Sequence, residues 1–391
     1  MEKPLKVGVI AGEVSGDLLG ADAIAALKRI HGGPVELVGV GGDGLEAEGL
    51  VSLFDYSELS IMGFTQVIAR LPKLLERIRQ TANALIAARP DVILIIDSPD
   101  FTHRVARKVR KAAPDIPIVN YVCPSVWAWK EYRARDMVAY VDHVLAVLPF
   151  EPRAMERLGG PPTTFVGHRL TAEQGVLAAR RQNRLERGMA SPTIMLLPGS
   201  RGSEIKSLAP VFRDVAAQFA ARNNPCRFVL PTVKRREAQV RAAIADWPVK
   251  PALFVGEEAK WEAFAMADAA VAASGTVVLE LALSGIPAVS AYKADFIGRM
   301  LLDKITIWSA SLPNIIADQP LVPEYFNNTM RAGALARWME LLTRDSHQRR
   351  GMIEGFERVI SLMETDVPPG ERAAAIILDV LGRKRGHRAS S

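Results

Sequence analysis

The sequence is poor in residues that form covalent or metal-based cross-links. Only Cys123 and Cys226 occur among its 391 residues, which excludes a disulfide framework and favours a reducing cytoplasm. No cluster of His, Cys and acidic side chains has the spacing of metal ligands. We therefore expect no metal site and no cofactor.

Long apolar runs are also missing. No stretch approaches the roughly 18 residues that a membrane-spanning helix needs. The first apolar run ends at Ala11 and is followed at once by Glu13 and Asp17, so it does not have the pattern of a signal peptide. Any membrane contact is therefore expected to be peripheral. The formal net charge of +6 is compatible with anionic substrates, an anionic membrane surface or nucleic acid, and does not choose among them.

The sequence does contain two successive series of short apolar strands, separated by helical runs. Apolar residues make up 49% and charged residues 24% of the chain, as in soluble globular proteins. Buried strands that lead into helices through glycine turns are typical of doubly wound α/β domains. We predict a first series of strands at 5–11, 35–40, 91–97, 118–122, 144–148 and 164–166, and a second at 193–197, 227–230, 252–255, 269–273 and 288–291.

A polar, arginine-rich stretch separates the two series. It predicts an N-terminal domain at 1–167, a linker at 168–191 and a second α/β domain at 192–345. Beyond the second domain we expect C-terminal helices at 346–382 that pack back on the N-terminal domain. The basic tail at 383–391 is expected to be disordered.

The second series contains a strand-to-helix turn that indicates ligand binding, Ser274-Gly275-Thr276. Small residues let a ligand approach the backbone, and the free amides of the following helix form a seat for an anion. Glu280 lies one turn further along the same helical face, where a carboxylate can accept hydrogen bonds from a ribose. An ordinary capped turn would have the same pattern.

A related turn follows the first strand of this series, in the string LPGSRGSE at 197–204, which contains Ser200, Arg201 and Glu204. It lacks the Lys-Ser/Thr pair of a P-loop, so it does not indicate a nucleotide hydrolase. Arg201 can donate a pair of hydrogen bonds to a diphosphate. Two anion-binding turns in one domain predict a nucleotide site.

Asp97 ends a strongly apolar strand of the first series. Reactive groups of open α/β sheets collect at the carboxyl ends of the strands, which makes Asp97 the candidate general base. Asp100 is explained by its place in the first turn of a helix that begins after Ser98.

An apolar stripe at 61–80 has two interpretations. Its apolar residues recur at helical spacing, with Arg70, Lys73 and Arg77 beside them. The stripe is either the core-facing side of an amphipathic helix or a surface that contacts a membrane or acyl chains. The residues assigned to that contact are Val67, Ile68, Leu71, Leu74 and Leu75.

Two tryptophans, Trp127 and Trp129, follow another strand of the first series, with Lys130 and Arg133 beside them. They either pack in the core or form an apolar wall next to groups that bind a phosphate.

In chain order, these stretches resemble one family closely, the lipid-A-disaccharide synthases. The matching strings run from about residue 5 to 330 and comprise AGEVSGD from Ala11, GGDGLEAEGL from Gly41, IMGFTQVI from Ile61, IDSPDF from Ile96, YVCPSVWAW from Tyr121, LPFE from Leu148, VGH from Val166, LPGSRGSEI from Leu197, AASGTVVLE from Ala272 and SLPN from Ser311. Small departures, such as Cys123 where the family usually has serine, concern the acceptor side of the site.

The resemblance implies a GT-B glycosyltransferase with two doubly wound Rossmann-like domains facing across a cleft and a helical C-terminus. Such enzymes move diacylglucosamine from UDP to the 6-hydroxyl of diacylglucosamine 1-phosphate and release UDP. The product has an inverted β-1,6 link. The family works without a metal at the cytoplasmic face of the inner membrane, in agreement with the D-x-x-D spacing of Asp97 and Asp100 in place of D-x-D. It implies no nucleic-acid partner and leaves a homodimer open.

The resemblance also implies roles for individual residues. Asp97 would be the general base, and Arg201 with the turn at 274–276 would neutralise the UDP leaving group. Glu280 would hold the ribose. The remaining cleft positions would orient the substrates, with Asn314, Ser200 and Glu204 on the donor side and Glu13, Ser15, Gly16, Trp127 and Trp129 on the acceptor side.

Two alternatives remain open. A UDP-N-acetylglucosamine 2-epimerase or a peptidoglycan glucosaminyltransferase would share the fold but would not need the stripe at 61–80. A nucleotide-sugar-binding or lipid-carrying protein with an inactive site would not need Asp97, Arg201 and Glu280 together.

Overall fold

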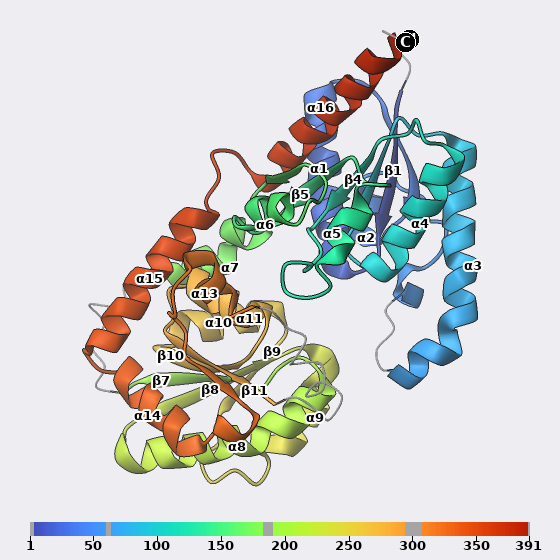
Figure 1. Cartoon of the computed structure of the whole chain (residues 1–391). Helices are drawn as coiled ribbons and strands as arrows, with labels where there is room; N and C mark the ends of the chain where they lie inside the picture. Colours follow the sequence, from blue (N-terminus) through green and yellow to red (C-terminus); the bar gives the residue numbers. More distant parts are fainter. Residues whose placement is uncertain (1–3, 60–63, 183–190, 294–306, 390–391) are drawn as a thin grey trace. The chain divides into compact units, whose positions relative to one another are not determined.

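The computed structural model describes residues 4–59, 64–182, 191–293 and 307–389; the side chains of 64–70 and 385–389 lie outside this description. Two compact units divide the chain. Unit 1 comprises Met1–Arg169 and Thr365–Ser391, and unit 2 comprises Leu170–Glu364. Each unit is built on a six-stranded sheet (Figure 1).

Unit 1 contains a parallel sheet in the order β2-β1-β3-β4-β5-β6. The strands are β1 (Leu5–Ala11), β2 (Val35–Val40), β3 (Val92–Ile96), β4 (Ile118–Tyr121), β5 (His143–Ala146) and β6 (Thr163–Phe165). The helices are α1 (Val14–His31), α2 (Asp43–Ala47), α3 (Phe64–Ala88), α4 (Pro99–Ala112), α5 (Tyr132–Met137), α6 (Glu151–Arg157) and α16 (Pro369–Ala389).

Unit 2 contains a parallel sheet in the order β12-β11-β10-β7-β8-β9. Its strands are β7 (Thr193–Leu197), β8 (Arg227–Thr232), β9 (Ala252–Val255), β10 (Ala269–Ala273), β11 (Ala288–Tyr292) and β12 (Glu324–Phe326). Its helices are α7 (Gln174–Arg180), α8 (Gly202–Arg222), α9 (Glu237–Ile244), α10 (Glu257–Met266), α11 (Thr276–Leu283), α13 (Leu312–Ala317), α14 (Ala332–Leu342) and α15 (His347–Met363).

The central strands are apolar throughout because helices cover both faces of each sheet. Every residue of β3 and β10 is buried. In unit 1, β3 lies between β1 and β4, and its register pairs Ile96 with Ala11 on one side and with Tyr121 on the other. The carboxyl ends of these three strands therefore lie side by side.

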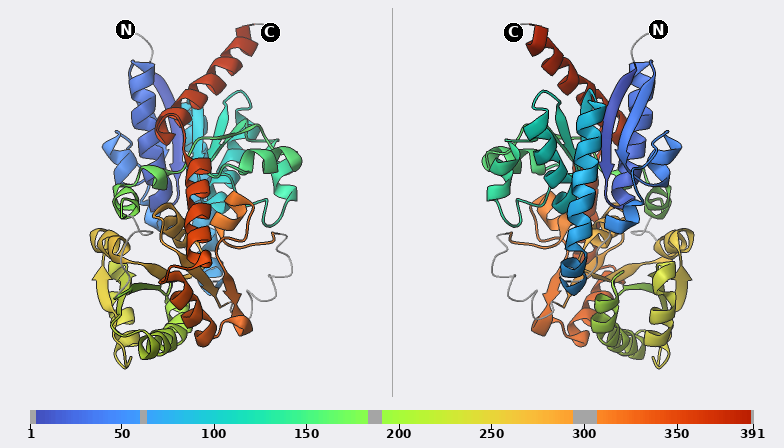
Figure 2. Two further views of the ribbon diagram at one scale, coloured as in Figure 1. Left: turned by 90° about the vertical axis from the view of Figure 1, so that its left-hand side faces the viewer. Right: turned by 90° about the vertical axis from the view of Figure 1, so that its right-hand side faces the viewer.

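The C-terminal helix α16 belongs to unit 1, where it packs along α1 (Figures 1 and 2). Its apolar face, with Ala373, Ala374 and Ile377, is fully buried. At its first turn Gly370 allows close contact, because a Cβ there would lie 2.4 Å from Oδ2 of Asp22.

The structure differs from the expected domain boundaries in three places. Residues expected in the linker form α7, which packs on α10 so closely that a Cβ on Gly175 would lie 2.1 Å from the Trp261 ring. The polar composition concealed this helix because only Val176 and Ala179 face the core. Helix α15 belongs to unit 2 and packs on α11 and α13, so of the C-terminal helices only α16 returns to unit 1. The expected disordered tail is helical to Ala389.

A buried carboxyl group joins two loops at the edge of unit 1. Glu151, at the start of α6, is only 2% exposed. Its Oε1 accepts a hydrogen bond from Nε1 of Trp127 at 3.2 Å, and its Oε2 accepts from the amides of Val147 and Leu148 at 3.2 and 3.0 Å. Burial raises the pKa of Glu151 to about 8, although these three donors oppose the shift.

We predict that Glu151 makes the stability of the protein pH-dependent. In the unfolded chain a glutamate ionises near pH 4.5, whereas folded Glu151 resists ionisation up to about pH 8. Its contribution to the free energy of unfolding is therefore full below about pH 4.5 and is lost as the pH rises to about 8. Denaturant unfolding measures the free energy of unfolding at pH 5 and at pH 8. From pH 5 to pH 8 this free energy should decrease less for Glu151→Gln than for the wild type. The control Glu156→Gln, on the exposed side of α6, should keep the wild-type decrease; equal decreases in all three proteins would contradict the prediction.

Candidate functional site

Unit 2 contains a pocket of about 640 Å³ at the carboxyl ends of four neighbouring strands. This is the edge at which open α/β sheets bind ligands. Its wall includes the ends of β7, β8 and β10 and the loop after β9. The lining residues are Leu197, Gly199, Ser200, Arg201, Glu204, Pro231, Thr232, Val233, Lys234, Gly256, Glu257, Lys260, Ala273, Ser274, Gly275, Thr276, Val277 and Glu280.

The turn Ser274-Gly275-Thr276 lines this pocket. Gly275 has a φ of 149°, which favours glycine, and a Cβ there would have no atom within 4 Å. Helix α11 begins at Thr276, so the amides of Thr276 and Val277 have no partner within the helix, whereas that of Val278 donates to the carbonyl of Gly275 at 3.1 Å. The turn therefore presents backbone donors and the positive end of the helix dipole to the pocket.

Glu280 also lines the pocket and forms an ion pair with Lys260, with Oε2 2.9 Å from Nζ. Burial raises the pKa of Glu280, and the positive charge of Lys260 opposes that shift. The Lys260 ammonium lies 4.2 Å from the centroid of the Trp261 ring. Sequence reasoning missed Lys260 and Lys234, because Lys260 lies on α10 and Lys234 follows β8, neither in an anion-binding pattern, and both reach the pocket only through the fold.

The β7–α8 turn has two different parts. Glu204 binds within the turn: its Oε2 accepts from the amide of Arg201 at 3.2 Å, and its Oε1 accepts from Nη1 of the same residue at 2.8 Å. Gly199 is required beside it, since a Cβ there would lie 2.3 Å from Oε2 of Glu204. The Arg201 side chain is 68% exposed at the pocket. Arg201 is thus available to a ligand, whereas the hydrogen bonds of Glu204 stabilise the turn.

The structure places Asn314 outside this pocket. The residue is 1% exposed, and its side-chain amide bonds both backbone groups of Val322, at 2.9 Å to the carbonyl and 2.7 Å from the amide. Its buried hydrogen bonds hold the loop after α13, which explains its presence without a ligand.

In unit 1, Asp97 lies at the carboxyl end of β3 in a strained turn. Asp97 and Ser98 have φ values of 50° and 43°, and Val122 at the end of the adjacent β4 has a φ of 73°. Non-glycine residues rarely adopt this left-handed region, and such strain occurs preferentially at functional sites. Oδ1 of Asp97 accepts from the amide of Ser98 at 2.8 Å. The strain supports the interpretation of this strand end as a site.

Glycines of the AGEVSGD string bring α1 against this turn. A Cβ on Gly12 would lie 2.4 Å from Oγ of Ser98, and one on Gly16 would lie 3.3 Å from Cγ2 of Ile96. Gly16 is therefore a packing residue. Glu13 and Ser15 are exposed at the start of the helix.

The acidic residue of that string has a role that sequence reasoning missed. Asp17 is buried, and its carboxylate accepts hydrogen bonds from the amides of Gly42, Gly44 and Leu45 at 2.7, 2.8 and 3.3 Å. Asp17 thus holds the start of α2 and links the AGEVSGD string to the GGDGLEAEGL string.

The two tryptophans, Trp127 and Trp129, differ in their exposure to solvent. Trp127 is 9% exposed, donates to Glu151 and packs edge-on against Phe150 with ring centroids 4.9 Å apart. Trp129 is 40% exposed, with the Lys130 ammonium 4.0 Å from its ring centroid. Trp127 is thus a packing residue, and only Trp129 is available as a surface.

The apolar stripe lies on α3, which runs lengthwise along unit 1 (Figure 2). Leu74 packs on the core and Ile78 is 1% exposed, whereas Leu71 and Leu75 are 40% and 44% exposed. The side chains of Val67 and Ile68 lie outside the described residues. The core thus covers Leu74 and Ile78 and leaves Leu71 and Leu75 partly exposed.

The basic residues beside the stripe have a structural role that the sequence did not indicate. Arg77 donates to both carboxylate oxygens of Glu58, at 2.8 and 3.1 Å, and Lys73 lies 3.3 Å from the same carboxylate. The guanidinium of Arg77 also lies over the Phe54 ring. Lys73 and Arg77 therefore pair with Glu58 and do not form a free basic fringe beside the apolar residues.

Within residues 4–59, 64–182, 191–293 and 307–389, no helix is long and apolar enough to cross a membrane. The same part of the chain contains no group of three or more His, Cys or acidic residues that could hold a metal ion.

Solved structures resemble this fold at low sequence identity. A glycotransferase of kitacinnamycin superposes with a TM-score of 0.64 at 18% identity, covering 97% of this chain and 100% of the other. MurG of Acinetobacter baumannii gives 0.56 at 16% identity, with the same coverage. A putative UDP-N-acetylglucosamine 2-epimerase of Listeria monocytogenes gives 0.61 at 12% identity, covering 98% of each chain. With two parallel six-stranded sheets, the chain has the GT-B fold that the resemblance implied.

Sequence comparison identifies the family. The model of the lipid-A-disaccharide synthetase family matches residues 7–366. The lipid-A-disaccharide synthase of Nitrobacter winogradskyi is 46% identical over 382 residues, covering 97% of this chain and 96% of the relative. That of Bradyrhizobium diazoefficiens is 44% identical over 382 residues, covering 97% of each. The chain therefore belongs to the lipid-A-disaccharide synthase family and is a glycosyltransferase.

Proposed function

We propose that the enzyme transfers 2,3-diacylglucosamine from UDP to the 6-hydroxyl of 2,3-diacylglucosamine 1-phosphate. The bond between the donor's anomeric carbon and the UDP oxygen breaks, and a bond from that carbon to the acceptor oxygen forms with inversion. The products are the β-1,6 disaccharide 1-phosphate and UDP. The observation that carries the proposal is the pocket of unit 2, whose turns suit a nucleoside diphosphate in a chain of this family.

The donor would bind in the pocket of unit 2. The amides at the start of α11 and the exposed guanidinium of Arg201 suit the two phosphates. Glu280 would accept hydrogen bonds from the ribose hydroxyls, with Lys260 favouring its ionised form. As the anomeric bond breaks, negative charge develops on UDP, and these groups would stabilise it. No step of this reaction requires a metal.

Asp97 would act as the general base, taking the proton of the acceptor hydroxyl as its oxygen attacks. Its place at a strained strand end supports this role. Glu13, Ser15 and Trp129 would contact the acceptor, since all three are exposed.

The fold alone does not separate this reaction from that of a UDP-N-acetylglucosamine 2-epimerase, because a putative epimerase superposes on this chain. Incubating the protein with UDP-diacylglucosamine and diacylglucosamine 1-phosphate separates the two. Release of UDP that depends on the acceptor supports the transferase, whereas conversion of UDP-N-acetylglucosamine without an acceptor supports the epimerase. Binding of substrates without any turnover would indicate an inactive carrier.

We predict that Arg201→Ala and Glu280→Gln both weaken UDP binding. Each removes a charged hydrogen-bonding group, which is worth roughly tenfold or more in affinity. Titration calorimetry with UDP measures the effect. Arg241→Ala serves as the control, because Arg241 pairs with Glu237 on the exposed side of α9. Unchanged affinity in both pocket variants would place the nucleotide elsewhere.

We predict that Asp97→Asn lowers turnover by about 10²–10⁴-fold, the usual contribution of a general base, and leaves UDP affinity unchanged. Asparagine retains an oxygen that can accept from the Ser98 amide, so the turn should survive. Asp115→Asn, in the loop before β4, should keep wild-type turnover. A folded Asp97→Asn with the wild-type rate would exclude Asp97 as the base.

We also propose that the exposed apolar residues of α3 contact acyl chains or the cytoplasmic face of the inner membrane, in a peripheral manner. Leu71 and Leu75 support this, since they continue the apolar face that is buried at Ile78. Because Glu58 pairs with Lys73 and Arg77, the contact would be mainly apolar and would depend weakly on salt. A homodimer is compatible with this arrangement.

The membrane proposal predicts that replacing Leu71 and Leu75 together by serine abolishes co-sedimentation with anionic phospholipid vesicles. The melting temperature should stay within a few degrees of the wild type, because both side chains are already exposed. The matched variant Ile78→Ser, on the same face but buried, should lose many degrees, since burial of such a side chain contributes about 1.5–3 kcal/mol. A large loss of melting temperature in the double variant, with unchanged co-sedimentation, would identify the stripe as core.

A further inference from the structure

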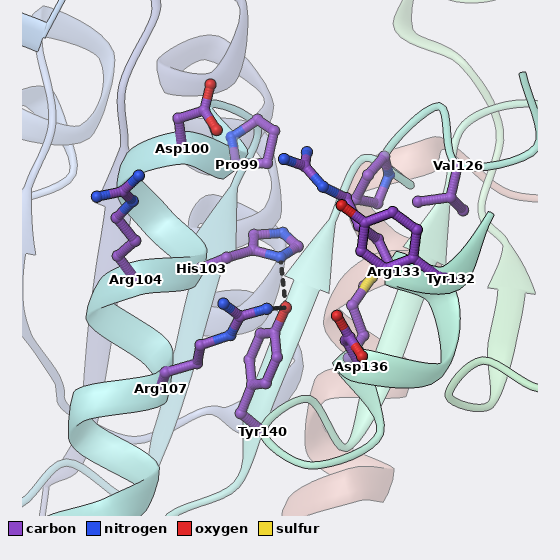
Figure 3. Close-up of a pocket in the computed structure, with 12 residues that line it drawn as sticks. Pro99, Asp100, His103, Arg104, Arg107, Val126, Tyr132, Arg133, Asp136 and Tyr140 are labelled. Carbon is purple, nitrogen blue, oxygen red and sulfur yellow. Dashed lines mark hydrogen bonds between the residues drawn. The ribbon is translucent and has the colours of Figure 1, made fainter. Parts of the chain in front are cut away.

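A second cavity, of about 190 Å³, lies wholly in unit 1 between α4, α5 and the loop after β4 (Figure 3). His103 and Arg107 reach it from α4, and Tyr132, Arg133 and Asp136 reach it from α5. The full lining is Pro99, Asp100, His103, Arg104, Arg107, Pro124, Val126, Tyr132, Arg133, Asp136, Met137 and Tyr140. Nothing in the donor pocket or at Asp97 uses these groups.

A chain of hydrogen bonds positions Arg107 in this cavity. Nδ2 of Asn120 donates to the carbonyl of Val122 at 2.9 Å, so its Oδ1 accepts from Nε2 of His103 at 3.1 Å. Burial lowers the pKa of His103 to about 4, and the ring is therefore neutral at pH 7. With its proton on Nε2, its Nδ1 accepts from the hydroxyl of Tyr140 at 3.0 Å.

The hydroxyl oxygen of Tyr140 in turn accepts from Nη2 of Arg107 at 3.4 Å. The guanidinium of Arg107 also lies 4.7 Å from the Tyr140 ring centroid. Each donor of this hydrogen-bond series is thus assigned as far as Arg107. Among the described residues, no other side-chain hydrogen bond uses the Arg107 guanidinium. The chain begins at Val122, the left-handed residue beside the turn of Asp97.

The charges of the cavity favour an anion with neighbouring hydroxyls. In the part of the chain that the structure describes, no ion pair joins Arg107 or Arg133 to a carboxylate, and Arg133 is half-buried. Arg104 adds a third positive charge, against the two carboxylates of Asp100 and Asp136. A bare dianion would meet those carboxylates, whereas a sugar phosphate can offer them hydroxyl donors while its phosphate meets the guanidinium groups.

We propose that this cavity binds the phosphate of the acceptor, as a phosphomonoester on the anomeric carbon of a hexosamine. The inference rests on the proposed function. Pro99 lines the cavity two residues after Asp97, so their Cα atoms are at most about 7.6 Å apart. One pyranose ring separates the C6 hydroxyl of the acceptor from its anomeric phosphate. The acceptor can therefore present its hydroxyl to Asp97 while its phosphate lies in this cavity.

Calorimetry with the full chain tests the site independently of turnover. The probes are glucosamine 1-phosphate, glucosamine and inorganic phosphate. We expect glucosamine 1-phosphate to bind most tightly, and Arg133→Gln and Arg107→Gln each to weaken it about 10- to 100-fold. Arg133 makes no side-chain hydrogen bond among the described residues, so its variant should fold. Lys108→Gln, an exposed residue of α4 outside the cavity lining, is the control and should bind like the wild type.

Equal binding of the phosphorylated and unphosphorylated sugars, or unchanged binding in both arginine variants, would overturn the proposal. Inorganic phosphate that binds as tightly as the sugar phosphate would assign the cavity to the free anion and would also overturn it. These outcomes do not depend on whether the wild type transfers sugar.

Turnover provides the second measurement. Acceptors with and without the 1-phosphate are compared by UDP release, and the ratio of their kcat/KM values should fall about 10-fold or more in Arg133→Gln, with the KM for the donor unchanged. If the wild type releases no UDP, the proposed function is contradicted. The calorimetric measurements then show by themselves whether the cavity binds a sugar phosphate. An active wild type with the same ratio in Arg133→Gln would contradict the site alone.

Discussion

The close approach of α1 to the end of β3 is the constraint on which the rest of unit 1 depends. A Cβ on Gly20 would lie 2.7 Å from Cδ1 of Ile96, and one on Gly12 would lie 2.4 Å from Oγ of Ser98. Glycine in α1 at position 20, and at position 12 just before the helix, allows the helix to pack so near the strand end. The contact holds Asp97 and Ser98 in their left-handed conformation, which isolated residues would avoid. The same helix carries Asp17, whose carboxylate organises the next loop.

Both units place chemical groups at the carboxyl ends of parallel strands, but by different means. In unit 2 the turns are formed by glycines with positive φ, Gly199 and Gly275, so the backbone itself lies open to the pocket. In unit 1 the corresponding turns contain residues other than glycine. Their left-handed conformation costs free energy, and packing contacts of the surrounding residues offset that cost. Exposed backbone amides can bind the phosphates of a nucleotide, whereas a partly exposed carboxylate such as that of Asp97 can accept a proton.

Buried polar contacts tie the two neighbouring strand ends of unit 1 together. The hydrogen-bond chain from Val122 through His103 to Arg107 connects the end of β4 to the far side of α4. Because every member is paired, the chain can hold a guanidinium in one place without leaving a buried donor unsatisfied. A movement of the strand end at Val122 would therefore change the position of the Arg107 guanidinium, and a movement of Arg107 would change the strand end.

Short stretches of the sequence predicted much about this protein before its tertiary structure was considered. The two strand series, the turns at 199–201 and 274–276, the position of Asp97 at a strand end and the family all follow from short stretches of the sequence. The tertiary structure decided which side chains meet. Lys260 with Glu280, and Glu58 with Lys73 and Arg77, are pairs from separate elements. Composition likewise hid α7, whose few buried residues lie in a polar stretch. Such contacts depend on how distant segments pack, and no local pattern records that packing.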